Sequence, residues 1–440
     1  LINATEDGTI GGTFVPVLQT LQQARPYVLI DVDGTSADAG TFIQDTVVLD
    51  FEIGLNNWPG DGSTIDLLVA TDYDVPGTNK NQAAVAQFID KVLLGDGSVP
   101  LGTLFAFIGT LPTEAAVIAA LDNLTTQDYA ATQIEVMNAG LRFADDMFGC
   151  EGLLNELEDG GCFSFSAEAN DFSRSATSDF RALDATSGGI RIQRESYIDQ
   201  GDLFAVSFGY GAGSFSNGDN FSANSQRFQL GAGIYKERTG FDHFWVLSGS
   251  YTEFDAERGV GVSTGLPGAG VVETTQPILE TTFRAGMTSE FALGQNGTYF
   301  APEFSFDLTY LRSFENTESG ATVGAKLSET EQLVLTINPS IEIGMNQQTP
   351  TGRHINSFVR GGLNIASTDT LFIDSTLAGV SEADGTFRNI SGFDDLRGQV
   401  ELGIELYNTD RTMFFEAGYA GEFGSLSNSH SLSASFGLQF

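Results

Sequence analysis

Apolar and polar side chains alternate along the last two-thirds of the chain, and few folds accommodate this pattern. Every second residue from Val400 to Leu406 is apolar, and the same holds from Phe304 to Tyr310. Alternation with period two places apolar side chains on one face of a β-strand and polar ones on the other. About twelve such segments follow one another: 162–171, 188–198, 202–216, 224–238, 242–257, 277–293, 297–313, 333–346, 353–366, 395–408, 412–423 and 430–440. We therefore predict an all-β membrane fold of about twelve antiparallel strands.

The connections between these segments alternate in length. Short turns are expected at Gln200-Gly201, Arg238-Thr239-Gly240, Gly294-Gln295-Asn296, 348–351 and Thr409-Asp410, and long loops at 258–276, 314–332 and 367–394. Tight turns at one rim and long loops at the other are typical of an outer-membrane β-barrel. A water-soluble β-sandwich also has alternating strands but rarely uses strands this long. The pattern favours a transmembrane barrel over residues 150–440.

Composition excludes several other classes of protein. The chain has 58 acidic and 20 basic side chains and a formal net charge of -38, which would repel nucleic acid. It has no run of the roughly 18 to 20 apolar residues that a spanning helix needs. The chain begins at Leu1 without a basic and apolar leader, which indicates either a removed signal peptide or a fragment.

The residues before the barrel have helical spacing. Thr113 is a candidate N-cap for a helix over 114–124, and Thr125 or Thr126 for a second helix of about 22 residues that Gly149 ends. At about 1.5 Å per residue the second helix would span about 33 Å, close to the thickness of a bilayer's hydrocarbon core. We assign 112–149 to a linker and this helix.

This second helix is too polar to face lipid, because it carries the side chains Glu135, Asn138, Arg142 and Asp145. A barrel of about twelve strands leaves room for one narrow helix, so we expect it inside the pore. The alternative is an amphipathic helix that packs on a soluble domain. Residues 1–111 contain β-prone runs at 27–32, 46–53 and 64–70 and a helical pattern at 79–94, and we expect them outside the membrane.

Four motifs occur in order along the chain. They are NKNQAAVA at 79–86, AALDNLTTQDYA at 119–130, GGI at 188–190 followed by GDLFAVSFGY at 201–210, and GLQF at 437–440. Together they resemble the autotransporters, the type V secretion family, over nearly all of the chain. The first is similar to the element that follows the last β-helical rungs of a passenger, and the second to the stretch that leads into the pore helix. The last two resemble the early and closing barrel strands.

The resemblance implies a type Va translocator, a monomer that exports an N-terminal passenger and anchors it at the bacterial cell surface. Its implied partners are outer-membrane lipid, the barrel assembly machinery, periplasmic chaperones and its own passenger. Residues 1–111 would then be the end of a passenger whose active part lies before Leu1. The implied assembly signal is Phe436, Gly437, Leu438 and Phe440.

Two other functions are alternatives. The head and the acidic outer loops could themselves act as a surface adhesin. The barrel could instead be a porin-like channel that the helix gates.

Asn138 is a weak candidate for one chemical reaction. Some autotransporters cut the pore helix through an asparagine that attacks its own backbone carbonyl, within a pair of asparagines after Glu-Val. Here Glu135-Val136 is followed by Met137 and then Asn138, so the first asparagine is missing. A polar helix residue that faces the lumen is the favoured interpretation, and we expect no catalytic residue, no enzymatic activity, no metal and no cofactor in this chain.

Cys150 and Cys162 bracket a short acidic loop between the helix and the first strand, and an oxidising compartment predicts a disulfide between them. The polar face of the strands predicts a set of lumen-facing charged residues: Glu168, Arg227, Glu280, Arg284, Glu303, Asp307, Glu342, Arg360, Glu401, Glu405 and Glu416. We expect Arg142 and the lumen arginines to pair with the carboxylates and orient the helix.

Overall fold

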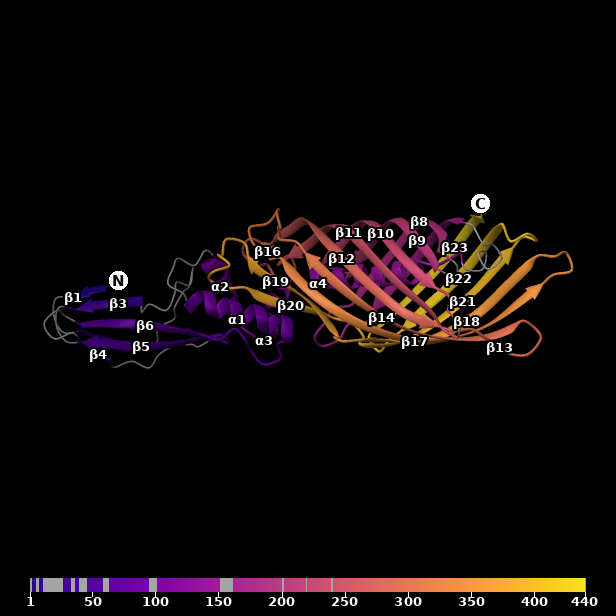
Figure 1. Cartoon of the computed structure of the whole chain (residues 1–440). Coiled ribbons are helices and arrows are strands. Elements are labelled where there is room, and N and C mark those ends of the chain that lie inside the picture. Colours follow the sequence, from indigo (N-terminus) through magenta and orange to yellow (C-terminus); the bar gives the residue numbers. More distant parts are fainter. Residues whose placement is uncertain are drawn as a thin grey trace.

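A computed structural model gives the fold of the chain. It describes residues 2–4, 8–10, 27–32, 36–38, 46–57, 63–94, 101–150, 161–199, 202–218, 220–238 and 240–439. A small β-structure at the N-terminal side, three helices and a long barrel follow one another along the molecule (Figure 1).

Twelve antiparallel strands close into the barrel within the described residues. They are β7 (Gly161–Arg174), β8 (Leu183–Asp199), β9 (Asp202–Ser216), β10 (Phe221–Lys236), β11 (Asp242–Val260), β12 (Gly270–Thr288), β14 (Thr298–Ser313), β17 (Thr330–Gln348), β18 (His354–Ala366), β21 (Leu396–Tyr407), β22 (Met413–Phe423) and β23 (Ser427–Gln439). The last strand, β23, pairs with β7, so the barrel has no free edge. A two-residue strand, β13 (Phe291–Ala292), pairs with β14 at one rim. The predicted twelve-stranded architecture is confirmed.

The barrel turns its apolar side chains outward. Phe208, Leu230 and Leu333 are 49%, 61% and 62% exposed on three different strands, whereas Gln276 and Thr252 of the opposite face are fully buried. An apolar exterior around a polar interior is the reverse of a water-soluble protein and is stable where the exterior meets lipid.

Two of the three long outer loops contain further strands, which corrects the prediction. β15 (Asn316–Thr317), β16 (Ala325–Leu327), β19 (Thr370–Leu377) and β20 (Phe387–Gly392) form a four-stranded sheet beside the barrel mouth. β11 and β12 also extend past the predicted strands, so the first long loop shrinks to 261–269. The apolar side chains of this sheet, Leu371 and Ile373 among them, are buried against the helix region instead of facing lipid. The predicted turns at Gln200-Gly201 and Thr239 lie outside the described residues.

The N-terminal β-structure contains two parallel pairings with one common offset. Its strands are β1 (Ile2–Ala4), β2 (Gly8–Ile10), β3 (Tyr27–Val32), β4 (Ser36–Asp38), β5 (Leu49–Asn57) and β6 (Ser63–Thr71). Ile2 lies opposite Ile30 and Gly8 lies opposite Ser36, so both pairings join residues 28 apart in the sequence. A constant offset between parallel strands is the signature of successive coils of a β-solenoid. The antiparallel β5–β6 hairpin continues the sheet from β3.

Four helices connect this β-structure to the barrel: α1 (Lys80–Leu94), α2 (Gly102–Gly109), α3 (Glu114–Leu124) and α4 (Gln127–Asp145). Thr113 caps α3 as predicted, because its side chain accepts a hydrogen bond from the backbone N–H of Ala116. α4 is shorter than the predicted 22 residues. The hydroxyl of Thr126 does not cap α4 but pairs with Asn389 and Ser375 of the outer sheet. No helix of the described residues is long and apolar enough to cross a membrane.

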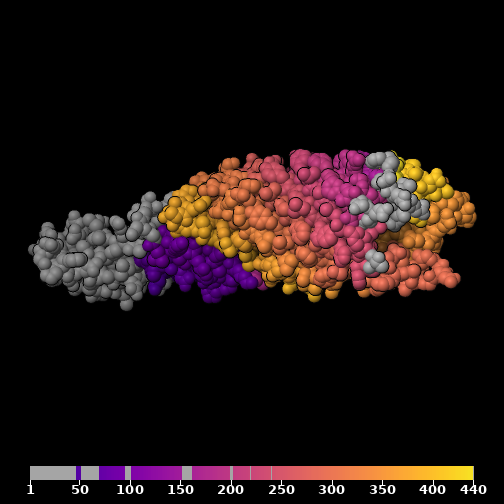
Figure 2. Space-filling view, in the orientation of Figure 1, coloured from indigo at the N-terminus to yellow at the C-terminus, as the bar shows by residue number. Residues whose placement is uncertain are grey.

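The first three helices share one apolar core with the outer loops of the barrel. The rings of Phe88 and Phe387 lie 5.1 Å apart. Leu104 of α2 is buried in the same cluster as Leu266 and Leu377, which come from two outer loops. Figure 2 shows the violet residues of these helices in contact with the orange outer strands. The short helix α2 was not predicted, because an apolar run of this length has no helical periodicity.

Asp394 joins the last hairpin of the barrel to the outer sheet. Its Oδ1 accepts hydrogen bonds from the backbone N–H groups of Ser425 and Leu426, at 2.6 and 2.9 Å. Its Oδ2 accepts from the N–H and hydroxyl of Ser427, at 2.8 and 2.6 Å. Burial alone would raise the pKa of Asp394, but these hydrogen bonds outweigh it, and the pKa lies below its ordinary value.

We therefore expect Asp394→Asn to destabilise the protein by about 1–3 kcal/mol at pH 7, because one acceptor oxygen becomes a donor. A carboxylate whose pKa is lowered by folding contributes stability above its unfolded pKa, and this contribution is lost as the pH falls through the folded pKa. The difference between variant and wild type should shrink below about pH 4. This difference is measured as the shift in the midpoint temperature of the heat-induced change in gel mobility, at pH 7 and at pH 3. The control is Asp374→Asn, because Asp374 of β19 pairs with the exposed Arg388 at the surface of the same outer sheet. Equal midpoints for both variants at pH 7 would contradict the expectation.

Candidate functional site

The helix α4 runs through the lumen of the barrel (Figure 1). Every residue from Gln127 to Leu141 is buried, including the polar ones. The helix packs against β10, β11, β12 and β14 of the wall and against β19 and β20 of the outer sheet. The candidate site is therefore the surface between this helix and the inner wall.

Three arginines of the barrel contact carboxylates of the helix at three levels: Arg181 in the outer connection between β7 and β8, Arg227 on β10 and Arg284 on β12. At the outer mouth, Nη1 of Arg181 lies 2.6 Å from Oδ2 of Asp128. In the middle, Nη1 of Arg227 lies 3.0 Å from Oε1 of Glu135. At the inner end, Arg284 forms an ion pair with Asp145. The predicted helix residues Glu135 and Asp145 are thus both ion-pair partners of predicted lumen arginines.

Arg227 and Arg284 lie at different depths in the lumen. Arg227 of β10 pairs in register with Thr252 of β11, which pairs with Ile278 of β12. Arg284 follows Ile278 by six residues, about 20 Å along the strand. Their partners Glu135 and Asp145 are separated by ten residues, about 15 Å of helix.

The outer mouth is closed by a buried polar network. The guanidinium of Arg258 donates to both carboxylate oxygens of Glu318 and to the backbone carbonyls of Asn123 and Thr125. The hydroxyl of Tyr129 donates to the same glutamate at 2.7 Å. Arginine and carboxylate are almost fully buried, so the junction between α3 and α4 is fixed to the wall.

Asn138 and Arg142 of the helix differ in their contacts with the barrel wall. Nη1 of Arg397 donates to Oδ1 of Asn138 at 3.1 Å and also pairs with Glu422. Arg142, which was expected to pair with carboxylates, forms no ion pair with the described residues, and its Nε has no hydrogen-bond partner among them. The wall arginines and not the helix arginine hold the helix. Arg258 and Arg397 were missed. Arg397 lies on the polar face of a predicted strand, whereas Arg258 was assigned to a loop and faces the lumen because β11 continues to Val260.

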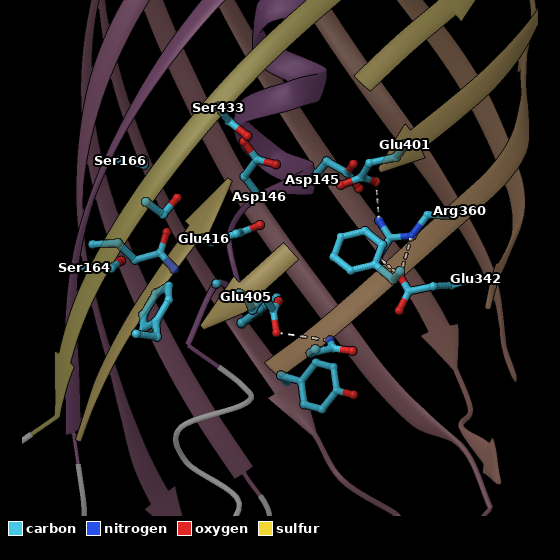
Figure 3. A pocket seen from close by; sticks show the side chains of 18 of the residues that line it. Asp145, Asp146, Ser164, Ser166, Glu342, Arg360, Glu401, Glu405, Glu416 and Ser433 are labelled. Atoms are coloured by element: carbon cyan, nitrogen blue, oxygen red, sulfur yellow. Dashed lines mark hydrogen bonds and ion pairs between the residues drawn. The ribbon is translucent and has the colours of Figure 1, made fainter. Parts of the chain in front are cut away.

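A cavity of about 1110 Å³ occupies the inner end of the lumen. Figure 3 shows Asp145 and Asp146 of the helix end directed into it, and Arg360 between Glu342 and Glu401. Of the predicted lumen residues, eight line this cavity: Glu168, Arg284, Glu303, Glu342, Arg360, Glu401, Glu405 and Glu416. The other three do not line this cavity. Glu280 and Arg227 meet the helix, and Asp307 contacts Arg284 and Asn338.

The lumen carboxylates are not arranged as a metal site. Among the described residues, no group of three or more His, Cys, Asp or Glu side chains is placed to hold a metal ion. His354 lines the cavity, whereas the rings of His243 and His430 stack on Trp245 and Tyr419. The arrangement suits ion pairing along a helix.

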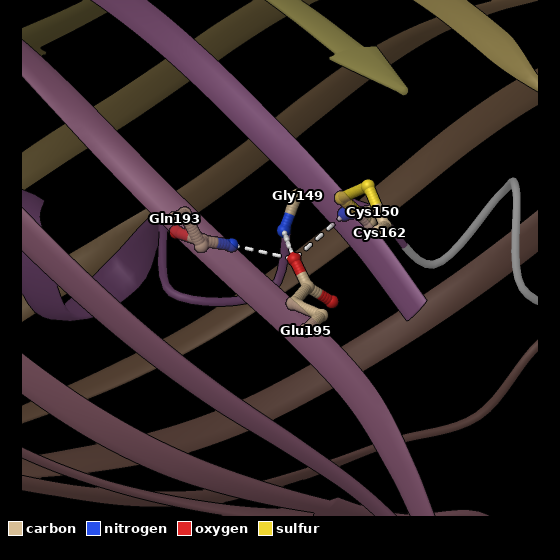
Figure 4. The surroundings of a disulfide bond; sticks show 5 residues. All are labelled: Gly149, Cys150, Cys162, Gln193 and Glu195. Carbon is tan, nitrogen blue, oxygen red and sulfur yellow. Dashed lines mark hydrogen bonds between the residues drawn. A yellow bond between two sulfur atoms is a disulfide. The ribbon is translucent and has the colours of Figure 1, made fainter. Parts of the chain in front are cut away.

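The predicted disulfide between Cys150 and Cys162 is confirmed. It joins the residues just after α4 to the first barrel strand, and Figure 4 shows Glu195 beside it. One oxygen of Glu195 accepts hydrogen bonds from the N–H groups of Gly149 and Cys150, both at 2.9 Å. The inner end of the helix is therefore fixed to the wall by one covalent and two hydrogen bonds. The acidic loop at 151–160 lies outside the described residues.

The residues of the implied assembly signal lie at the end of β23. Phe436 and Leu438 are exposed on the outer surface, and Gly437 pairs with Phe414 of β22. Phe440 lies outside the described residues.

A family model, the autotransporter β-domain, matches residues 164–420, which is more than half of the chain. The chain belongs to the autotransporter family. In this autotransporter the barrel lies in the outer membrane and exports a passenger to the cell surface. Family membership does not favour the adhesin or the porin-like alternative. No curated protein sequence matches the chain.

Solved structures of other autotransporters are similar to this one in fold. The translocator domain of autotransporter NalP from Neisseria meningitidis is 12% identical, with a TM-score of 0.56, over 74% of this chain and 99% of that chain. The β-domain of the Bordetella autotransporter BrkA is 13% identical, with a TM-score of 0.44, over 63% and 98%. The transport unit of AIDA-I from Escherichia coli is 12% identical, with a TM-score of 0.40, over 68% and 98%. Of these three, only the NalP domain has a TM-score above 0.5, so it is the one that supports the fold.

Proposed function

We propose that this autotransporter retains α4 in its lumen after export as an uncleaved anchor for the exported chain. One observation carries the proposal: an arginine of the β7–β8 connection and two arginines of the wall bind the helix at its outer end, middle and inner end. The disulfide at Cys150 adds a covalent fixation of its base. Residues 1–111 would then be the passenger end, 112–149 the linker and pore helix, and 150–440 the translocator.

The surroundings of Asn138 support an anchor without self-cleavage. Its side-chain oxygen is bound by Arg397, which Glu422 holds in place at 2.6 Å. Cyclisation of this side chain onto its own carbonyl would disturb the hydrogen bond that a buried arginine donates to it. Met137 also occupies the position of the first asparagine of the family motif. The protein is therefore not an enzyme in this proposal.

The finer partners also belong to the proposal. The barrel assembly machinery would read the last strand at Phe436, Gly437, Leu438 and Phe440, and periplasmic chaperones would hold the chain before assembly. The parallel pairings of the N-terminal strands, 28 residues apart, support a β-solenoid passenger end. The barrel would act as a monomer.

A peptide tag before Leu1 tests this proposal in intact cells. We expect the tag to be accessible to antibody and the chain to run as one band near 46.9 kDa plus the tag. The matched control carries the tag in the turn Gly294-Gln295-Asn296, at the opposite rim, where antibody should not reach it. An inaccessible N-terminal tag would contradict export. Two fragments divided within α4 would contradict the uncleaved anchor.

A further inference from the structure

The three carboxylates that meet wall arginines are irregularly spaced along α4. Asp128 and Glu135 are seven residues apart, and Glu135 and Asp145 are ten residues apart. At 1.5 Å per residue these intervals are about 10 and about 15 Å. Because the two intervals differ, the three carboxylates can all meet the three fixed arginines in only one position of the helix along the lumen.

Two of these arginines form ion pairs only with α3 and α4. Among the described residues, Arg227 pairs with Glu135 alone, and the two side chains are 3% and 8% exposed. Arg181 pairs, within the same described part of the chain, only with Asp128 of α4 and Asp122 of α3. A helix in another register would leave these arginines without an ion-pair partner in a largely buried site, which is unfavourable. The wall carboxylate Glu280 lies within electrostatic range of Arg227 but forms no ion pair with it in the described residues.

The third arginine has wall partners as well, but the helix supplies the closest one. Arg284 lies 3.4 Å from Asp307 and 3.5 Å from Glu303, and it is nearer to Asp145. Asp145 of the helix is therefore one of three carboxylates around Arg284, and Arg284 would keep two of them without the helix. The contribution of this level to the register should be the smallest of the three.

We infer that Arg181, Arg227 and Arg284 form a carboxylate-reading site that sets where the exported chain stops. The ligand of the site is a helical segment with carboxylates at intervals of seven and ten residues. A shift of one helical turn, about 5.4 Å, moves each carboxylate out of ion-pair range of its arginine. The inference rests on the proposed function, because it assumes that the chain moves through this lumen before α4 comes to rest.

A cross-linking experiment in intact cells can read the register directly. Nε2 of Gln229 donates to the backbone carbonyl of Ala139 at 3.3 Å, so position 229 faces the middle of the helix. A photo-reactive phenylalanine analogue placed at Gln229 should cross-link to residues around Ala139 in the wild type. Mass spectrometry of the linked peptides gives the position, and the N-terminal tag reports export in the same cells.

The test variant combines Asp128→Asn, Glu135→Gln and Asp145→Asn, which keep the shape of the helix and remove its three negative charges. We expect cross-linking around Ala139 to fall at least threefold, with new cross-links one turn or more away and unchanged tag exposure. The matched control neutralises three exposed carboxylates: Glu114→Gln, Asp171→Asn and Glu253→Gln. An unchanged cross-linking position in the test variant would overturn the inference.

A charge exchange keeps the inference testable if the triple variant does not fold. Glu135→Arg alone should displace the cross-link from Ala139, and Glu135→Arg combined with Arg227→Glu should return it. If the exchange does not return it, the register is not set by charge. A wild-type chain whose tag is not exposed contradicts export itself, a result that is distinct from either outcome at Ala139.

Discussion

Replacing Arg258 with methionine should destabilise the folded protein by about 3–5 kcal/mol, the usual cost of breaking a buried ion pair by removing one partner. The side chains of Arg258 and Glu318 are 2% and 0% exposed. The substitution leaves the glutamate charged in a buried site and removes the donor to the carbonyls of Asn123 and Thr125. Unfolding by denaturant in detergent micelles, followed by gel mobility, measures the free energy.

The matched control for this experiment is Arg312→Met. Arg312 pairs with Glu329 at 2.8 Å, but the two side chains are 36% and 43% exposed. A half-exposed pair contributes about 0–1 kcal/mol, so the control should change little. The double variant Arg258→Met with Glu318→Gln should regain part of the loss, since the buried charge is gone. An Arg258→Met variant as stable as the control would show that the mouth network does not stabilise the fold.

The barrel was predictable from the sequence because strand alternation fixes which side chains face inward. A slip of one residue would move every apolar side chain of a strand to the polar face, so register is strongly specified. Glu401 and Glu405 were assigned to the lumen from this parity alone, and both line the inner cavity. The same parity contains Arg397, which a complete count of polar-face arginines would have found. Arg258 could not be found in this way, because the predicted strand ended at 257 whereas β11 continues to Val260.

The outer sheet was not predictable, because alternation does not distinguish lipid from another protein surface. Leu371 and Ile373 alternate as barrel residues do, yet they cover the lumen helix above the membrane. The sequence also gives no indication that the short strands of two different outer loops pair with each other. The connections at 314–332 and 367–394 are long, as predicted, but the short strands within both were not predicted.

The partners of the helix could not be predicted, because they depend on its rotation within the barrel. Arg397 and Asn138 are 259 residues apart in the sequence, and no local pattern joins them. The helix pattern marks Arg142 and Asp145 as polar without telling which of them meets a charged wall residue. Asp145 pairs with Arg284, whereas Arg142 forms no ion pair with the described residues.

Replacing Gly140 with leucine should displace α4 from the lumen. A Cβ atom at this position would overlap the carboxyl group of Glu280, whose Oε2 would lie 2.7 Å away. That carboxylate is 1% exposed and accepts a hydrogen bond from Thr282, so moving it aside would break this bond in a buried site. Overpacking of this kind costs about 1–3 kcal/mol or more. Intrinsic helix propensity acts in the opposite direction, since leucine is better than glycine by under about 1 kcal/mol.

The sign of the effect on stability therefore decides whether the helix contacts the wall at this point. A stabilised Gly140→Leu variant would mean that position 140 is free of the wall, and it would contradict the seated helix. Single-channel conductance adds a second measurement. We expect the variant to conduct nearly as much as a chain that lacks 112–149, while the wild type conducts little. Combining Gly140→Leu with Glu280→Ala removes the overlapping carboxyl group and should restore most of the low conductance, whereas Glu280→Ala alone should leave it low.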